Sequence, residues 1–363
     1  MYAKIMSKDV QEGWTIMSIK KEKKSRLKLL NQDRAPLERR AVQLLFGLIT
    51  LLIGIQFIRF VNSYADPNAT LLVHRPAGVE AFLPISALVA LKSWLYTGIF
   101  DIIHPAGLVI LLLAMALSLL FKRSFCSWIC PIGTLCEGLA ILGRKLWGRN
   151  FVLPRWLDYP LRSLKYILLS FFLVFILILM DGPSAYGFLQ TPYNMIADVK
   201  MLDFFKNLTL TGMTVIAVLA LLSAVIQNFW CRYLCPYGAL MSLLSIFSPW
   251  KIRRNGDTCI SCQKCTAVCP NQLKVAEAKD IWSPECSGCL NCVKSCPVKG
   301  TLEFSLPSSS GKGLAFDPKR TAIVLILVWF MVVGLAKFTG HWETSIPPEM
   351  YRVLIPQAEQ FNH

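Results

Sequence analysis

The chain has 363 residues, of which 54% are hydrophobic and only 17% are charged, with a formal net charge of +16 at pH 7. A soluble domain has about 25% charged residues, so this composition excludes an ordinary soluble protein and indicates helices that lie in a membrane. The positive charge does not indicate a nucleic-acid-binding protein, because its distribution follows the membrane topology predicted below.

The first 40 residues form a basic cytoplasmic tail. Five lysines and one arginine lie between residues 20 and 28, which favours contact with anionic lipid headgroups. These residues are mostly polar, and no cleavage site of small residues follows the first apolar run. We therefore expect no secretory signal peptide, and we expect the first apolar run to stay as an anchor.

Residues 41–250 are predicted to form a membrane domain, with one further span after the soluble module. Apolar runs that approach the ~20 residues needed to cross a bilayer indicate about five transmembrane helices, and four or six remain compatible with the pattern. These runs cover residues 41–60, 105–121, 164–180, 208–226 and 321–334.

The lysines and arginines divide unequally between the loops on the two sides of these spans. With the N-terminus in the cytoplasm, 30 of the 38 fall on the cytoplasmic side and 5 on the opposite side. This is the positive-inside bias expected of an integral membrane protein.

Ionisable residues lie in the long outer segment 61–104. Such groups at membrane depth are functional candidates, so His74, Glu80, Asp101 and His104 form a candidate quinol site that would accept protons. The alternative is that the interfacial histidines only make structural hydrogen bonds.

A short motif at residues 125–133 is repeated 105 residues later. F-C-S-W-I-C-P-I-G matches W-C-R-Y-L-C-P-Y-G at 230–238, and each copy follows an apolar span. Both spans run in the same direction, so we expect a parallel repeat with a functional site where its halves meet. Since residues i and i+4 are neighbours on a helix, the repeat presents four thiolates, a full ligand set for an iron–sulfur cluster. These are Cys126, Cys130, Cys231 and Cys235.

Three uses of these four cysteines are open: a third iron–sulfur cluster, a metal such as cuprous ion, or a redox-active dithiol. Buried cysteines can also pack as small hydrophobic residues, but the duplicated spacing argues against this. Cys136 has no counterpart, because the second copy has Met241 there. We expect Cys136 to belong to the core.

Residues 251–306 form a predicted soluble module that contains eight cysteines. The spacing C-x-x-C-x-x-C-x-x-x-C-P occurs twice, which is typical of bacterial ferredoxins with two 4Fe–4S clusters, where the fourth cysteine of each run binds the other cluster. Zinc also binds paired cysteines, but it does not require the final Cys-Pro. Cluster 1 is therefore assigned to Cys259, Cys262, Cys265 and Cys296, and cluster 2 to Cys286, Cys289, Cys292 and Cys269.

The rest of the chain is predicted as a linker (307–320), a last transmembrane helix (321–338) and a periplasmic tail (339–363). The expected fold is an α-helical integral membrane protein with an internal parallel repeat. A small α+β bacterial-type two-cluster ferredoxin domain is inserted before its last helix.

With these motifs, the chain resembles the NosR/NapH-type membrane polyferredoxins, which are related to the CcoG proteins. The resemblance extends from about residue 41 to the C-terminal tail. It is carried by the H-R-P-A-G-V-E segment at 74–80, both C-x-x-x-C-P motifs, D-V-K-M-L-D-F-F at 198–205 and Y-R-V-L-I-P at 351–356. It implies a bacterial inner-membrane protein with two cytoplasmic 4Fe–4S clusters on the eight cysteines and a role in electron transfer.

We therefore expect an electron carrier rather than an enzyme with its own substrate. Electrons would pass between the quinone pool or a flavoprotein partner and the clusters, with a further redox protein as partner and no nucleic acid. The resemblance to CcoG proteins offers an alternative, a maturation factor whose C-x-x-x-C-P cysteines bind or reduce copper. A redox-sensing regulator is a third reading, for which the sequence offers no DNA-binding or kinase segment.

Overall fold

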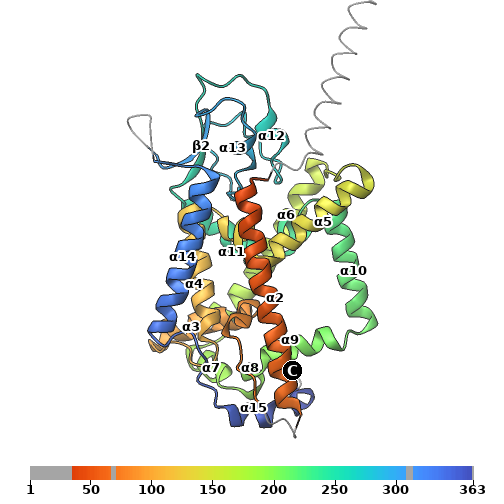
Figure 1. Ribbon diagram of the computed structural model, residues 1–363, viewed down its shortest axis with the longest axis vertical. Helices are drawn as coiled ribbons and strands as arrows, with labels where there is room; N and C mark the ends of the chain where they lie inside the picture. Colours follow the sequence, from red (N-terminus) through yellow and green to blue (C-terminus); the bar gives the residue numbers. More distant parts are fainter. Residues whose placement is uncertain (1–34, 67–70, 308–313, 362–363) are drawn as a thin grey trace, which may run out of the picture.

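The computed structural model describes residues 35–66, 71–307 and 314–361. Most of the expected basic tail and the middle of the expected linker lie outside these residues. The described chain is mainly helical, and the soluble module lies at one end of the long axis (Figure 1).

The first part of the chain contains helices and short helical turns. They are α2 (Leu37–Ala65), η1 (Ala77–Phe82), α3 (Pro84–Thr97), α4 (Pro105–Phe121), η2 (Phe125–Ile129), α5 (Pro131–Trp147), α6 (Arg155–Leu173), η3 (Val174–Leu179), α7 (Gly182–Leu189), α8 (Pro192–Met195), α9 (Ala197–Lys206), α10 (Leu210–Val225), η4 (Trp230–Leu234), α11 (Pro236–Leu244) and η5 (Ser245–Phe247).

The remaining part contains the module and the last long helix. Its elements are β1 (Lys251–Arg254), α12 (Lys264–Ala267), α13 (Asn291–Ser295), β2 (Leu302–Ser305), β3 (Ala315–Phe316), α14 (Pro318–Phe338), α15 (Pro348–Leu354) and η6 (Ala358–Gln360).

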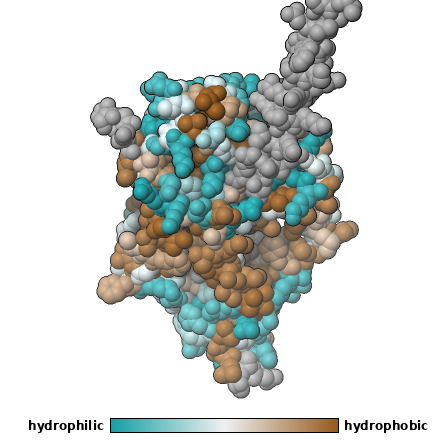
Figure 2. Space-filling model, turned by 45° about the horizontal axis from the view of Figure 1, so that its top comes forward, coloured by the Kyte–Doolittle hydropathy of each residue, from teal (hydrophilic) through white to brown (hydrophobic). Residues whose placement is uncertain are grey.

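All five expected spans are helical, but they differ in length. Among the described residues, three helical segments are long and apolar enough to cross a membrane: α2 with 29 residues, α6 with η3 (25 residues) and α14 with 21 residues. A fourth candidate is the pair α9 and α10, which is bent by 88°. The helix α4 has only 17 residues. On the face shown in Figure 2, apolar residues form a band across the middle, with more polar surface above and below it, as expected for a protein that lies in a bilayer.

The module contains a three-stranded antiparallel sheet in the order β1-β2-β3. Lys251 pairs with Ser305 in β2, and Phe304 of β2 pairs with Phe316 of β3. The strand β3 and the first residues of α14 lie within the described end of the expected linker 307–320. Asp317 then accepts a hydrogen bond from the backbone N–H of Arg320 at 2.8 Å. This cap starts α14 at Pro318, three residues before the expected start.

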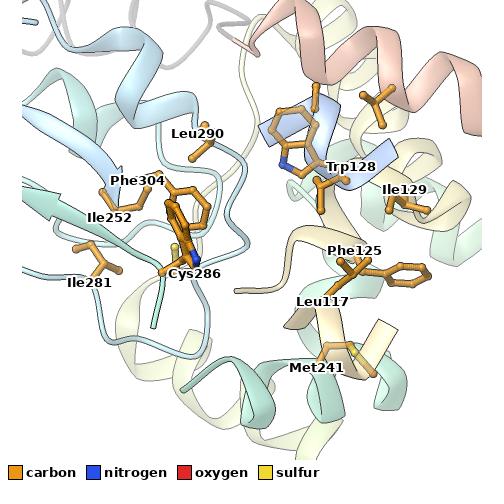
Figure 3. Packing of buried hydrophobic residues seen from close by; sticks show 14 of the residues in the cluster. Leu117, Phe125, Trp128, Ile129, Met241, Ile252, Ile281, Cys286, Leu290 and Phe304 are labelled. Atoms are coloured by element: carbon orange, nitrogen blue, oxygen red, sulfur yellow. The ribbon is translucent and has the colours of Figure 1, made fainter. Parts of the chain in front are cut away.

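One buried hydrophobic cluster joins the module to the membrane helices. It includes Leu117 and Trp128 on the membrane side and Ile252, Leu290 and Phe304 from the module (Figure 3). A segment of about 50 residues buries little apolar surface by itself. The module therefore shares its core with the repeat instead of folding around a separate one.

Candidate functional site

The eight cysteines of the module line two cavities, each with three cysteines from one run and the fourth from the other. The first cavity is lined by Cys259, Cys262, Cys265 and Cys296. The second is lined by Cys286, Cys289, Cys292 and Cys269. These are the two sets that the spacing predicts, and the crossing of the fourth cysteine is the arrangement of a two-cluster ferredoxin.

The two cysteine loops have the same backbone conformation. Ser261 and Gln263 have φ of 53° and 58°, and the matching residues Gly288 and Leu290 have φ of 60° and 59°. A left-handed conformation costs free energy for residues other than glycine and persists only where the surrounding structure holds it. Turns of this kind direct successive backbone N–H groups toward one point, which suits an anionic group such as a thiolate-ligated cluster.

The two cavities differ in exposure to solvent. Cys262 of the first cavity is exposed, whereas Cys286, Cys289 and Cys292 are each only 8% exposed. Burial raises the pKa of Cys286, and it raises the pKa of Cys269 to about 12. These thiols are therefore protonated in the metal-free protein, and metal binding must release their protons.

The two C-x-x-x-C-P motifs adopt the same unusual backbone. The first four residues of each lie in a π-helical turn, η2 or η4, and the amide of Cys130 bonds the carbonyl of Phe125 at 2.9 Å. In the second copy, Cys235 bonds Trp230 at 3.0 Å. The expected α-helical i, i+4 geometry is therefore replaced by wider i, i+5 turns, which are frequent at functional sites.

Both motifs end in the same way. Cys130 and Cys235 have extended backbone and directly precede the prolines that begin α5 and α11. A side chain at Gly133 would bring its Cβ to 2.2 Å from the carbonyl of Cys126. Only glycine fits at position 133, whereas a Cβ at the matching Gly238 would make only ordinary contacts of 3.5 Å or more.

The four repeat cysteines are half-buried and lie close enough together for their thiols to interact, and we call this group the quartet. Burial raises the pKa of Cys130 to about 12, and the nearby thiols of Cys126 and Cys235 add to this effect. Burial also raises the pKa of Cys235 to about 11, although its Sγ accepts a hydrogen bond from the amide of Gly238 at 3.2 Å. N–H···S bonds of this kind are a means by which proteins adjust the reduction potential of iron–sulfur clusters.

Cys136, which we expected in the core, is buried and is hydrogen-bonded to Cys231 of the quartet. A hydrogen bond with Cys136 is the largest cause that raises the pKa of Cys231 well above its usual value. Cys136 is 4% exposed. Cys136 lies in α5, outside the repeated motif. The motif alone therefore did not indicate that Cys136 lies close to Cys231.

The quartet loops are hydrogen-bonded to the loops of the second cavity. Ser127 Oγ donates to the carbonyl of Ser287 at 2.6 Å, and Trp128 Nε1 donates to the carbonyl of Gly288 at 3.0 Å. In the second copy, Arg232 Nη1 donates to the carbonyl of Pro270 at 3.2 Å. Residues inside each C-x-x-x-C motif therefore hold the segments that follow Cys286 and Cys269.

Buried charges lie between the quartet and the second cavity. Glu285 accepts from Lys165 Nζ at 2.7 and 2.8 Å and lies 3.4 Å from Arg123 Nη1. Burial would raise the pKa of Glu285, but Arg123 and Lys165 lower it to about 2. Glu285 is therefore ionised. Because it directly precedes Cys286, its ion pairs connect the loop of the second cavity to Lys165 of α6 and to Arg123 after α4.

The side chains fit iron–sulfur groups. The two cavities offer four thiols each, and the Nε of Arg123, beside the quartet, is buried without an acceptor of good hydrogen-bond geometry in the described structure. Across residues 35–66, 71–307 and 314–361, no three His, Cys, Asp or Glu side chains converge on a position for a single metal ion. A four-iron cluster is held differently, since each thiolate binds its own iron and the four sulfurs surround the cluster.

The outer residues divide into two groups. Glu80, Asp101 and His104 are buried together, whereas the side chain of His74 is 75% exposed and lies 3.9 Å from Glu343. His74 lies in a segment without regular secondary structure, and the next residue, Arg75, is buried.

Arg75 connects a network that we call the outer network. Its guanidinium bonds Glu80 at 2.7 Å and Asp198 at 2.8 Å, and His104 Nε2 bonds the carbonyl of Asn194 at 2.6 Å. Asp198 lies 123 residues from Arg75 in the sequence. The sequence reasoning missed Asp198 and Asn194, although D-V-K-M-L-D-F-F at 198–205 is one of the segments in which the chain resembles its relatives.

Two protein families match the chain over the regions that contain these sites. A family described as "4Fe-4S binding domain" matches residues 103–150 and again residues 208–255, which include the two halves of the quartet. A family described as "4Fe-4S dicluster domain" matches residues 251–297. The chain therefore contains iron–sulfur-binding domains.

Several curated proteins are similar to the chain. YccM of Escherichia coli, named for a proposed role in electron transport, is 44% identical over 90% of this chain and 91% of its own length. The uncharacterised protein MJ0750 of Methanocaldococcus jannaschii is 32% identical over 54% of this chain and 77% of its own. The ferredoxin-type protein NapH of Haemophilus influenzae is 26% identical over 61% and 76%, respectively. No solved structure matches the chain.

Proposed function

Because the chain belongs to the NosR/NapH-type family of membrane polyferredoxins, we propose that it carries single electrons between a membrane-side partner and a soluble one. Its general role as an iron–sulfur electron-transfer protein follows from the families that match it. The proposal adds the order of the sites and the nature of the partners. When bound, iron–sulfur clusters accept and release single electrons.

In this proposal the cysteines form three sites that pass electrons from one to the next. The quartet lies in the membrane repeat, Cys269 with Cys286, Cys289 and Cys292 forms the middle site, and the exposed Cys262 belongs to the last. The observation that carries this order is the pair of hydrogen bonds from Ser127 and Trp128 to the loop between Cys286 and Cys289. Because electron tunnelling weakens steeply with distance, such direct contact favours transfer between neighbouring sites.

The two ends of this row suit different partners. The last site opens to solvent at Cys262, so a soluble redox protein is proposed there. On the membrane side we propose the quinone pool or a flavoprotein. The excess of basic residues supports a cytoplasmic module in the bacterial inner membrane, because 30 of 38 Lys and Arg residues lie on that side of the expected topology.

The quinol site at Glu80, Asp101 and His104 stays a prediction, and Arg75 and Asp198 join it as partners. The helix α4, with 17 residues, separates this outer network from the quartet by about 26 Å. A quinol bound there would need a further step to pass electrons to the quartet.

Iron content and paramagnetic resonance test the proposal on the full chain, purified without oxygen. We expect about twelve irons per chain if the quartet holds a cluster. The double change Cys126→Ser and Cys231→Ser should remove about four irons and abolish reduction by quinol in inverted membrane vesicles. The matched change Cys259→Ser and Cys262→Ser should also remove about four irons but leave quinol-driven reduction of the quartet intact.

Three outcomes would contradict the proposal or redirect it. A colourless protein without a resonance signal after reduction with dithionite would refute the iron–sulfur role. An iron content near eight in both the unmodified protein and the Cys126→Ser and Cys231→Ser variant would refute a cluster at the quartet. Stoichiometric copper that is lost with those two changes would support the maturation-factor alternative.

A further inference from the structure

We propose that Arg123 is a charge-tuning residue that makes both the quartet and the middle site easier to reduce. The inference rests on the proposed function, because it assumes that both sites hold iron–sulfur clusters. It assigns a role to a side chain that belongs to no cysteine motif and that sequence reasoning did not single out.

Arg123 occupies a buried position between the two sites. It lies after α4 and three residues before Cys126, and it is 4% exposed. Its Nη1 donates to Ser242 Oγ at 2.8 Å and lies 3.4 Å from Glu285 Oε2. Its charge also interacts with the thiols of Cys126 and Cys231 and with Tyr166.

The charges around Arg123 do not balance within the described residues. Glu285 is shared by Arg123 and Lys165, so two cations face one carboxylate. Lys122 adds a third buried cation, with its Nζ 3.4 Å from the carbonyl of Trp282 and its charge close to Cys286. An excess of buried positive charge is costly unless an anion compensates it. The thiolates of the two cysteine sites are the anions at hand.

The hydrogen-bonding state of Arg123 supports the same conclusion. A guanidinium has five N–H donors, yet the Nε of Arg123 is buried without an acceptor of good hydrogen-bond geometry in the described structure, and the thiol of Cys126 lies against the same guanidinium. An unpaired buried donor is rare in native proteins and indicates an acceptor that belongs to the working molecule. The sulfur atoms of a thiolate-bound cluster are acceptors of the required charge.

This placement has a consequence for redox potential. One-electron reduction adds a negative charge to a group that four thiolates already make anionic. A fixed cation beside such a group stabilises the reduced form more than the oxidised form. At an effective dielectric constant of about 20, loss of one unit charge within about 10 Å changes the reduction equilibrium more than tenfold.

The test is a potentiometric titration of the full chain, followed by paramagnetic resonance at each potential. Arg123→Gln should lower the equilibrium constant for reduction of the quartet at least tenfold, which is about 59 mV for a one-electron couple. Arg123→Lys, which keeps the charge, should stay within about threefold of the unmodified protein. Glu285→Gln removes the opposing charge and should raise the potential of the middle site.

The opposite signs separate charge tuning from structural damage, because damage does not raise one potential while it lowers another. Arg352→Gln is the control, since Arg352 is an exposed arginine of α15, at the end of the molecule opposite the module (Figure 1). It should leave both potentials unchanged. If Arg123→Gln loses the quartet signal, Lys165→Gln is measured instead and should lower the potential of the middle site.

The inference is overturned if Arg123→Gln and Glu285→Gln leave potentials unchanged or shift them in the same direction. It is also overturned if Arg123→Lys lowers the potential as much as Arg123→Gln. These results require an iron-loaded protein with resonance signals. Failure of the proposed function is a different result, namely the absence of iron and of those signals.

Discussion

The indole N–H of Trp128 donates a 3.0 Å hydrogen bond to the carbonyl of Gly288. Trp128 lies between Cys126 and Cys130, and Gly288 lies between Cys286 and Cys289. The two ligand loops are 160 residues apart in the sequence, yet they are in direct contact. The quartet and the middle site are therefore held at a fixed separation by a buried, fully packed side chain.

Changing Trp128 to Phe should slow electron transfer between the quartet and the middle site without loss of iron. Phe keeps an aromatic ring but leaves the buried carbonyl of Gly288 unpaired, which costs about 1–3 kcal/mol and loosens the contact. Rapid-freeze paramagnetic resonance after addition of quinol measures the rate. Trp250→Phe is the control for lost ring size, because Trp250 is also buried in the same cluster. Equal rates in both variants would show that the hydrogen bond is irrelevant.

Changing Gly288 to Ala should disrupt the middle site selectively. The new Cβ would lie 2.9 Å from Ser124 Oγ and 3.2 Å from the carbonyl of Phe121, at a φ of +60°. The left-handed conformation costs about 1–2 kcal/mol for alanine, and overpacking adds about 1–3 kcal/mol. Gly148→Ala is the matched control, since Gly148 has φ +72° and no atom within 4 Å of an added Cβ. Thermal unfolding and iron content should change more at position 288, and similar changes at both positions would rule out the steric explanation.

A strong iron chelator should remove the cluster at the exposed site first. Cys262 is exposed, whereas Cys286, Cys289 and Cys292 are buried, and access controls the rate at which a chelator reaches thiolate-bound iron. Iron release followed by absorbance should therefore show a fast and a slow phase. The Cys259→Ser and Cys262→Ser variant should lack the fast phase. A single phase in the unmodified protein would contradict the inferred difference in access.

Changing Glu80 to Gln should destabilise the protein in a pH-dependent way. Arg75 and His104 hold the pKa of Glu80 below its usual 4.5 against the opposing effect of burial, and Glu80 raises the pKa of His104 above its usual 6.5, again against burial. The contribution of Glu80 is lost as pH falls below 4.5, and that of His104 is lost as pH rises through its raised pKa. The unfolding temperatures of the two proteins should differ most between these limits, with a loss of about 3–5 kcal/mol for a broken buried pair. A pH-independent difference would contradict this account.

The sequence predicted the parts of the site that depend on local spacing. The two ligand sets follow from cysteine runs in which loop geometry is determined over a few residues, and the structure groups the same eight side chains around two cavities. The five apolar runs are all helical as well, because an apolar run is also a local pattern of consecutive residues. The i, i+4 expectation for the repeat was wrong in detail, because spacing alone does not distinguish an α-helical turn from the π-helical turn that is observed.

The partners that the sequence did not reveal are distant in the chain. Arg123 and Glu285 are 162 residues apart, and Arg75 and Asp198 are 123 residues apart. Such pairs depend on tertiary packing, and no periodic pattern connects them. His74 was grouped with the outer residues because of its position in the sequence, but its side chain is exposed whereas that of its neighbour Arg75 is buried.

The strand β3 has a consequence for biosynthesis. It completes the sheet from a position after both cysteine runs and immediately before α14. The sheet can therefore close only after the chain leading into that helix has left the ribosome. Assembly machinery that delivers iron during translation would meet thiols in a nascent chain whose sheet still lacks its third strand.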